Sequence, residues 1–301
     1  MKLRIEPAGL HWFDRSTGMH LLVDEVTPPP TAWSVAPRTL SIALSNACDL
    51  NCHFCYRPHN ADTLPLVFVQ QVATTADELG TLEITLGGGE PLLYPGIQHL
   101  CAWIWTHTSL GVSITTHGHH LTPRLVRELA GNVSSMRFSI DGLEPYYSRI
   151  RGVELSALLR NIEDVQGVIP FGINTVVSSG HLAELSRVVD LAIALGAHDL
   201  LVIPEHHGGH FALSSHEWQR LAEIITTYQG RCRLTITHTA ADAVKVPCLH
   251  TEGPDDFVFA HLSADRKLKA HSYGRTGISI DEAGAMEEAF LSLHPKGGLC
   301  A

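Results

Sequence analysis

The sequence predicts an α/β protein whose parallel strands alternate with helices and curl into a barrel or partial barrel. The first observation is a series of short runs rich in β-branched residues, at 40–46, 82–86, 112–116, 135–140, 171–177 and 199–204. The second is a series of amphipathic segments, at 65–80, 95–109, 122–131, 145–166, 181–196 and 214–229. The third is a repeat length of about 30 residues, the size of one strand–helix–strand crossover. Six such units favour a parallel sheet with helices outside it.

Two of the expected helices carry start signals. Thr122 is followed by Pro123, whose fixed φ suits the first turn of a helix. Ser214 and Ser215 are followed by Glu217, a pattern typical of a helix start. In folds of this class, function gathers at the carboxyl ends of the parallel strands, so the loops after the strands are where a site is expected.

The segments that flank the repeating unit have a different character. Residues 1–36 predict an extended or hairpin lead-in, and residues 37–238 contain the barrel unit with a further strand-like run at 233–239. Residues 239–301 predict a small α+β appendage that ends in a helix near 282–293. We therefore expect three parts, with the barrel in the middle.

Composition excludes several classes of partner. The chain has 301 residues and a net charge of −10 without a Lys/Arg cluster in the sequence, which argues against nucleic-acid binding. The longest apolar runs are too short to span a bilayer, and the first residues lack the apolar segment of a signal peptide. Seven cysteines in such a chain indicate a cytoplasmic protein, in which clustered cysteines serve metal binding or catalysis more often than disulfides.

Glycines and short polar side chains follow the first four strands. Three cysteines, Cys48, Cys52 and Cys55, follow the first strand, and the run GGGEP at 87–91 follows the second. The run THG at 116–118 follows the third strand, and SIDG at 139–142 follows the fourth. A glycine after a single strand is usually only a turn. Four such loops at one edge of a sheet indicate a shared binding site.

The three cysteines allow more than one chemistry. Three thiolates can hold three irons of a [4Fe–4S] cube and leave the fourth iron open, where the amino and carboxylate groups of an amino acid could chelate it. A tetrahedral zinc site would need His53 or His59 as its fourth ligand. A third alternative is a set of buried, inert thiols, which the polar neighbours Asn46 and Asp49 disfavour.

Taken together, these motifs resemble the radical S-adenosylmethionine (SAM) superfamily. The matching runs are CDLNCHFC, GGGEP, THG and SIDG, and the resemblance covers roughly residues 38–205. It implies a partial (β/α)6 barrel with a [4Fe–4S] cluster on Cys48, Cys52 and Cys55. It also implies that SAM binds the open iron and that one electron cleaves it to methionine and a 5′-deoxyadenosyl radical, which takes a hydrogen atom from a substrate.

The resemblance also assigns roles to residues that bind SAM. Phe54 would contact the adenine, and Gly88, Gly89 and Glu90 would hold the amino group, which a negative carboxylate attracts. The remaining expected contacts are, for ribose or carboxylate, Thr116 and Ser139, and, for SAM more generally, Asn174 and Arg151. Asn174 has the alternative of a satisfied core asparagine, and Arg151 the alternative of a surface arginine.

Two groups of histidines follow the third and sixth strands, at 117–120 and 206–210. We expect them to be polar loop residues, with a second metal site as the alternative. Glu205 and His206 are the candidates for substrate contact or proton transfer, although no catalytic role follows for them from sequence.

The C-terminal segment resembles a SPASM or twitch domain, the region that holds additional iron–sulfur clusters in many peptide-modifying members of the superfamily. Cys248 matches the opening cysteine, whereas Arg266 stands where glycine is expected and His271 where the second cysteine is expected. We therefore expect a degenerate domain that has kept its fold and lost its cluster. The alternative is an unusual site on Cys248, His271 and Cys300.

The resemblance favours one substrate class and leaves two others. The first is a ribosomally synthesised precursor peptide, with backbone rearrangement or excision, cross-linking and epimerisation all open. That class implies a separate leader-peptide-recognition protein, and every radical SAM reaction needs an external one-electron reductant. The second class is a small molecule such as a sugar, nucleoside or amino acid. The remote third alternative is a regulator that binds zinc or a cluster without catalysis.

Overall fold

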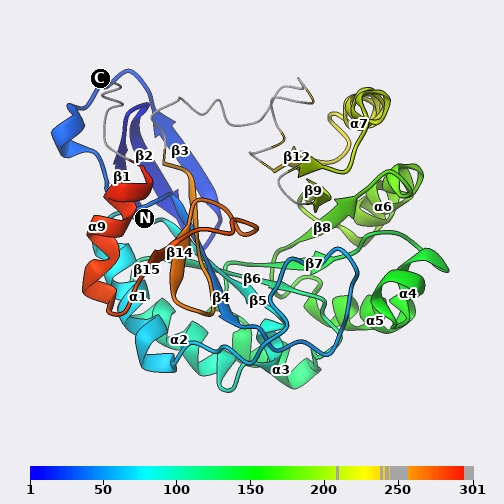
Figure 1. Ribbon diagram of the computed structural model, residues 1–301, viewed down its shortest axis with the longest axis horizontal. Coiled ribbons are helices and arrows are strands. Elements are labelled where there is room, and N and C mark those ends of the chain that lie inside the picture. The colour runs from blue at the N-terminus through cyan, green and yellow to red at the C-terminus, as the bar shows by residue number, and fades with distance from the viewer. Residues whose placement is uncertain (208–209, 238–239, 241–243, 245–256, 295–301) are drawn as a thin grey trace.

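The computed structural model describes residues 1–207, 210–237, 240, 244 and 257–294, and a single large sheet forms its centre (Figure 1). Within these residues the sheet has ten strands in the order β12-β9-β8-β7-β6-β5-β4-β13-β14-β15. From β12 to β13 every neighbouring pair runs parallel, and the last two pairs are antiparallel. The predicted α/β fold with a mostly parallel sheet is confirmed.

The six predicted strands form within two residues of their expected limits. They are β4 (Thr39–Ser45), β5 (Glu83–Gly88), β6 (Gly111–Thr116), β7 (Ser135–Ser139), β8 (Phe171–Val177) and β9 (Leu200–Pro204). The run expected at 233–239 forms β12 (Leu234–Ile236), which extends the sheet beside β9. Two short strands, β10 (His206–His207) and β11 (His210–Phe211), follow β9 as a separate pair.

Helices follow the strands and cover one face of the sheet (Figure 1). They are α1 (Leu66–Glu78), α2 (Ile97–His107), α3 (Pro123–Leu129), α4 (Tyr146–Arg151), α5 (Leu155–Val165), α6 (Leu182–Leu195) and α7 (Ser215–Thr227), with the short η2 (Pro91–Leu93) before α2. Both start signals are confirmed, since Thr122 caps Leu125 N–H and Ser214 forms a capping box with Glu217. The single helix expected over 145–166 is instead two, because Gly152 adopts a left-handed φ of 74° that ends α4.

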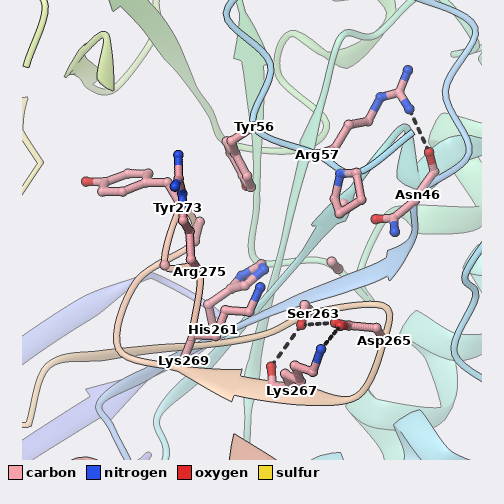
Figure 2. A pocket seen from close by; sticks show the side chains of 15 residues that line it. Asn46, Tyr56, Arg57, His261, Ser263, Asp265, Lys267, Lys269, Tyr273 and Arg275 are labelled. Atoms are coloured by element: carbon pink, nitrogen blue, oxygen red, sulfur yellow. Dashed lines mark hydrogen bonds and ion pairs between the residues drawn. The ribbon is translucent and has the colours of Figure 1, made fainter. Parts of the chain in front are cut away.

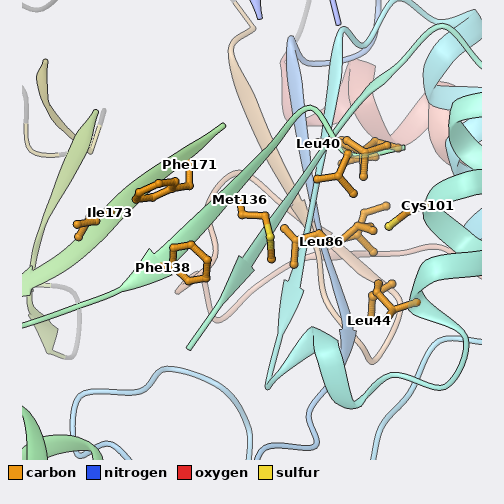
Figure 3. Close-up of a cluster of buried hydrophobic side chains, with 14 of the residues drawn as sticks. Leu40, Leu44, Leu86, Cys101, Met136, Phe138, Phe171 and Ile173 are labelled. Carbon is orange, nitrogen blue, oxygen red and sulfur yellow. The ribbon is translucent and has the colours of Figure 1, made fainter. Parts of the chain in front are cut away.

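The hydrophobic core lies between the sheet and these helices. Alternate residues of each strand face the helices, as Leu40 and Ile42 of β4 and Ile84 and Leu86 of β5 do, and all four are fully buried (Figure 3). Each such side chain contributes about 1.5–3 kcal/mol through burial. The other face of the sheet carries polar residues that hydrogen-bond across strands, for example Thr85 Oγ1 and Ser113 Oγ at 2.8 Å. Packing therefore fixes the sheet from the helix side and leaves the opposite face polar.

The lead-in is a separate antiparallel sheet of β1 (Lys2–Glu6), β2 (Gly9–Asp14) and β3 (Met19–Val23), followed by the short η1 (Pro30–Ala32). A buried charge network joins it to the large sheet. The Arg4 guanidinium donates to the Ala36 carbonyl at 2.6 Å and to Glu6 Oε1 at 2.7 Å. Arg38 donates to both oxygens of Glu6, at 2.9 and 2.7 Å. Because Arg38 immediately precedes β4, this network ties the lead-in to the strand that leads into the cysteine loop.

The C-terminal strands continue the large sheet. β13 (Phe259–Leu262) pairs in parallel with β4, and β14 (Lys267–Lys269) and β15 (Ile278–Ser279) follow as an antiparallel meander. The short η3 (Ala283–Ala285) and α9 (Met286–Leu293) then pack beside α1, in place of the helix expected near 282–293 (Figure 1). As a result, β13 and β14 lie next to the strand that carries the cysteine loop at its end.

A search of the helices in the described ranges found none with both the length and the apolar character that a membrane crossing requires.

We predict that Glu6→Gln lowers the free energy of unfolding by about 3–5 kcal/mol in urea titration, because it leaves two buried guanidiniums without a counter-charge. Burial opposes ionisation, yet hydrogen bonds from His11 and Arg38 lower the pKa of Glu6. Its stabilisation is therefore fully present above the unfolded pKa of about 4.3 and is lost as pH falls through the folded pKa.

The variant should lose that acid-side fall in stability as well. Glu287→Gln, at an exposed position of α9, serves as the control and should change the free energy of unfolding by less than about 0.5 kcal/mol. Equal stability of Glu6→Gln and the parent protein would contradict the role given to the network.

Candidate functional site

The loop after β4 carries the three cysteines and is held by its own backbone and by Arg57. The two terminal nitrogens of Arg57 donate to the carbonyl oxygens of Asn46 and Leu50, each at 3.0 Å. Within the loop, Cys55 N–H donates to the Cys52 carbonyl at 3.1 Å. Cys48, Cys52 and Cys55 are all free thiols and partly exposed. The loop thus presents three thiols from a fixed backbone turn.

The glycines at the end of β5 press directly against this loop. A Cβ on Gly89 would lie 2.0 Å from the Ala47 carbonyl oxygen, and one on Gly88 would lie 2.4 Å from the Ser45 carbonyl oxygen. Gly88 also has a φ of 120°, a conformation that L side chains rarely adopt. Gly89 N–H donates to the Ser45 carbonyl at 2.7 Å, and Glu90 N–H donates to the Ala47 carbonyl at 2.8 Å. Only glycine allows the two backbones to come this close.

Glu90 is buried and joins three neighbouring loops. Its Oε1 accepts hydrogen bonds from Leu92 N–H at 3.0 Å and from the Thr116 hydroxyl at 2.5 Å. Its Oε2 accepts from His117 N–H at 3.0 Å and lies 3.2 Å from His117 Nε2. Two predicted residues, Glu90 and Thr116, are therefore in direct contact, and the carboxylate is a structural hub for the ends of β5 and β6.

The histidines after β6 reach back to the cysteine loop through Asp49. Nε2 of buried His117 lies 3.0 Å from Asp49 Oδ1, and Nε2 of His120 lies 3.0 Å from Asp49 Oδ2. His119 N–H donates to His117 Nδ1 at 3.2 Å, so that nitrogen is an acceptor and the proton of a neutral ring sits on Nε2. Burial, with the nearby His117 as a smaller cause, lowers the pKa of His119 to about 4. These histidines orient the loop.

Arg151 forms a buried ion pair beside Phe54. Its guanidinium donates to Asp141 Oδ2 at 2.8 and 2.5 Å, and Asp141 Oδ1 accepts from Val176 N–H at 2.9 Å. The guanidinium carbon lies 5.8 Å from the centre of the Phe54 ring. Arg151 is 9% exposed, so the alternative of a surface arginine is wrong. Burial raises the pKa of the adjacent Cys52 thiol, and the charge of Arg151 partly offsets that rise.

Ser139 and Asn174 lie side by side at the ends of β7 and β8, where they are paired in the sheet register. Both are partly buried. Asn174 Oδ1 accepts a hydrogen bond from Arg137 Nε at 2.6 Å, and Arg137 also pairs with Asp199 at 3.0 Å. Asn174 therefore has a hydrogen-bonded partner on the polar face of the sheet, and its amide nitrogen remains as the donor toward a ligand.

Glu205 and His206 follow β9. Glu205 is 5% exposed, and its backbone N–H donates to the Val177 carbonyl at 2.8 Å. The ring of His206 stacks on Tyr273 with ring centres 4.6 Å apart. His206 thus joins the sixth strand end to the segment after β14, whereas Glu205 is turned into the interior.

The cysteine loop fits an iron–sulfur cluster better than a single ion. Among the described residues, one group of three metal-ligating side chains brings its ligand atoms within 4.8 Å of one another, and it is Cys48, Asp49 and His117. It uses neither His53 nor His59, which the zinc alternative requires. The three cysteines do not meet that limit, although sulfurs around tetrahedral zinc stand about 4 Å apart. Burial raises the pKa of Cys48, so that a bound metal has to supply the stabilisation of the thiolate.

Sequence reasoning missed part of this arrangement. Asp49 and His117 were seen only as a polar neighbour and one of several loop histidines, yet they join the loops after β4 and β6. The partner of Arg151 is Asp141, which the SIDG run already contains. Their spacing of 10 residues and their opposite charges were the available signal.

Two proteins with similar sequences and one family model match the chain. Residues 42–192 match the model described as the radical SAM superfamily. An AdoMet-dependent heme synthase from Methanosarcina barkeri is 29% identical over 70% of this chain and 64% of its own length. A GTP 3′,8-cyclase from Peptoclostridium acidaminophilum is 32% identical over 47% of this chain and 47% of its own length. The chain thus spans less than two thirds of either relative.

The fold is similar to that of SuiB from Streptococcus suis. The structure of SuiB bound to S-adenosylmethionine has a TM-score of 0.74 at 14% identity and covers 98% of this chain and 89% of SuiB. The structure of SuiB bound to the precursor peptide SuiA also has a TM-score of 0.74, with 94% and 86% covered. At this identity the likeness concerns the fold alone.

We predict that Gly89→Ala lowers the free energy of unfolding by about 1–3 kcal/mol, because the added Cβ forces the Ala47 carbonyl and the cysteine loop to move. Chemical denaturation of the metal-free protein measures the change. Gly284→Ala is the matched control, since its Cβ would meet nothing within 4 Å. Equal effects of the two substitutions would argue against the close approach of β5 to the loop.

Proposed function

The chain belongs to the radical SAM superfamily, and from this premise we propose that it is an enzyme that cleaves S-adenosylmethionine reductively and removes hydrogen from a substrate. The observation that carries the proposal is the apposition of the three-cysteine loop with the glycines of β5. Cys48, Cys52 and Cys55 would hold a [4Fe–4S] cluster. When bound, the cluster supplies the electron that converts SAM to methionine and a 5′-deoxyadenosyl radical.

The proposed SAM contacts surround the cysteine loop. The backbone of Gly88 and Gly89 and the charge of Glu90 would hold the amino group. The proposal draws on the negative charge that Glu90 keeps while its oxygens accept hydrogen bonds from the chain. The adenine would lie against Phe54, which is half-buried in the same loop. Each of these groups is positioned by the contact between β5 and the loop.

The opposite end of SAM has a candidate cation. Arg151 would pair with the SAM carboxylate, since its guanidinium is buried near both Phe54 and Cys52. Asp141 would act as a positioning residue that fixes the guanidinium through two hydrogen bonds. Thr116, Ser139 and Asn174 would contribute ribose or carboxylate contacts from the ends of β6, β7 and β8.

Two residues after β9 are proposed to contact the substrate. His206 presents a ring stacked on Tyr273. Glu205 is buried, and its negative charge acts on His181, whose pKa is nevertheless lowered by burial. A proton could pass between these groups and a bound substrate, and this is the role we propose for Glu205 and His206.

We propose a ribosomally synthesised precursor peptide as the substrate. The likeness to SuiB, which was solved with its precursor peptide SuiA, supports this class. The transformation would be backbone rearrangement or excision, cross-linking or epimerisation. A separate leader-peptide-recognition protein and an external one-electron reductant would act as partners.

The C-terminal strands are proposed to be a degenerate twitch domain that has lost its cluster. His271 lies after β14 with its Nδ1 buried and without a hydrogen-bond partner among the described residues. The other two candidate ligands, Cys248 and Cys300, lie outside the described residues. In this proposal the segment serves substrate binding.

A second candidate is a small-molecule substrate, which the two curated relatives favour. One is named for GTP and the other for heme. Incubating the reconstituted enzyme with SAM, a reductant and either GTP or the precursor peptide encoded beside its gene separates the candidates. We expect 5′-deoxyadenosine formation to rise with the peptide and its mass to change, and GTP to have neither effect. A rise with GTP alone would replace the peptide proposal with the second candidate.

Cys52→Ala should abolish SAM cleavage, because the loss of one thiolate leaves the cube underligated. Anaerobic reconstitution, iron analysis and chromatographic measurement of 5′-deoxyadenosine test this. Cys232→Ala is the matched control, since Cys232 lies outside the loop, and it should keep both iron content and SAM cleavage. Normal 5′-deoxyadenosine formation by Cys52→Ala would show that the cluster assignment is wrong. A colourless parent protein that holds one zinc would favour the non-catalytic regulator instead.

A further inference from the structure

We infer that the pocket between the cysteine loop and strands β13 and β14 binds an anionic group of the substrate, a carboxylate or a phosphate. The inference rests on the proposed function, because it assigns the pocket to the molecule from which hydrogen is removed. It adds a feature of the substrate that neither the motifs nor the relatives define.

The pocket lies next to the proposed SAM site. It has a volume of about 310 Å³, and its lining includes Tyr56 and Arg57, which directly follow Cys55, together with Gly88. Its other side comes from β13, β14 and the segment after them, including Lys269 and Tyr273 (Figure 2). A ligand in this pocket would therefore lie against the loop that carries the cysteines.

Positive charge is concentrated in this pocket. Four cationic side chains, Arg57, Lys267, Lys269 and Arg275, line it with one carboxylate, Asp265, which gives a local charge of 4 − 1 = +3. The whole chain has a net charge of −10. Such a reversal of sign in a confined space attracts anions and raises their local concentration.

His261 adds polarity to the pocket but no charge. Burial, with a smaller contribution from Lys269, lowers its pKa to about 4, so the ring is neutral near pH 7. Its Nδ1 lies 3.1 Å from Ser41 Oγ. The positive charge of the pocket therefore depends on the lysines and arginines and does not titrate with this histidine.

Most of this charge has no carboxylate partner within the described residues. Lys267 pairs with Asp265 at 2.8 Å. Arg57 donates to two backbone carbonyls, which are neutral, and its Nε is buried without a hydrogen-bond partner. Lys269 and Arg275 form no ion pair with a described residue. Buried or confined cations without counter-charges are costly, and a bound anion removes that cost.

The aromatic residues connect the pocket to the proposed substrate contact. Tyr273 lines the pocket and stacks on His206, and Tyr56 lies with its ring centre 6.4 Å from that of Tyr273. Arg151, the proposed partner of the SAM carboxylate, is not part of the lining. SAM and the anionic group would thus use different cations, on different sides of the cysteine loop.

Isothermal titration at low ionic strength tests the inference with the reconstituted full-length protein. The probes are inorganic tripolyphosphate and a triglutamate peptide blocked at both ends, with blocked triglutamine as the uncharged control. We expect one or both anions to bind and triglutamine not to bind. Binding should weaken as salt is added, because the attraction is between charges near the surface. The two anions distinguish a phosphate from a carboxylate as the natural group.

Variants with opposite expected effects sharpen the test. Lys269→Gln with Arg275→Gln should weaken binding at least about tenfold, as the loss of charge-assisted contacts requires. Asp265→Asn should strengthen it severalfold, because it removes the single carboxylate and releases Lys267. The double variant Arg124→Gln with Arg187→Gln removes two exposed cations elsewhere and should leave the affinity unchanged. A thermal melt of each variant checks that the fold is retained.

Several results would overturn the inference: no binding of either anion, equal affinity in the Lys269/Arg275 variant, or displacement of the anion by SAM. A parallel SAM-cleavage assay of the parent protein keeps this outcome separate from that of the proposed function. Anion binding with the expected opposite shifts in a protein that does not cleave SAM would support the pocket and reject the proposed function. SAM cleavage without anion binding would do the reverse.

Discussion

The contact between the end of β5 and the backbone of the cysteine loop is the constraint on which the site depends. Gly89 lies so close to Ala47 that a single methyl group would collide with the carbonyl oxygen. Glu90 follows at once and binds Thr116 and His117, and His117 in turn holds Asp49 within the cysteine loop. These hydrogen bonds form a closed circuit around the ends of β4, β5 and β6. The three thiols are therefore positioned by the sheet rather than by their own short loop.

Much of the fold could be predicted from the sequence because the strands and helices of the barrel differ in hydrophobic period. Gly152 was the exception, since a left-handed glycine inside an amphipathic stretch ends a helix without changing the pattern around it. The pairing of β13 with β4 could not be predicted, because it joins segments about 220 residues apart whose local patterns do not name their partner. For the site, motif order located the cysteines and glycines, and only the folded chain revealed the links made by Asp49.

Charge is a second property that only the folded chain reveals. The sequence shows no cluster of lysines and arginines, yet Arg57 meets Lys269 and Arg275 where the cysteine loop approaches β14. The parallel pairing of β13 with β4 produces this meeting, since it places the C-terminal strands beside the strand that enters the cysteine loop. The same packing brings Tyr273 to His206. The C-terminal strands thus supply one wall of the substrate region, whether or not they ever held a cluster of their own.

The central claim is that the missing fourth thiolate is a coordination position kept for SAM. Electron–nuclear double resonance of the reduced, reconstituted protein measures this directly with SAM labelled isotopically at its amino nitrogen. The account predicts that SAM alters the resonance of the reduced cluster and that the labelled nitrogen is coupled to it. A resonance unchanged by SAM, with no coupling to the label, would contradict the account and would return the three cysteines to a structural role.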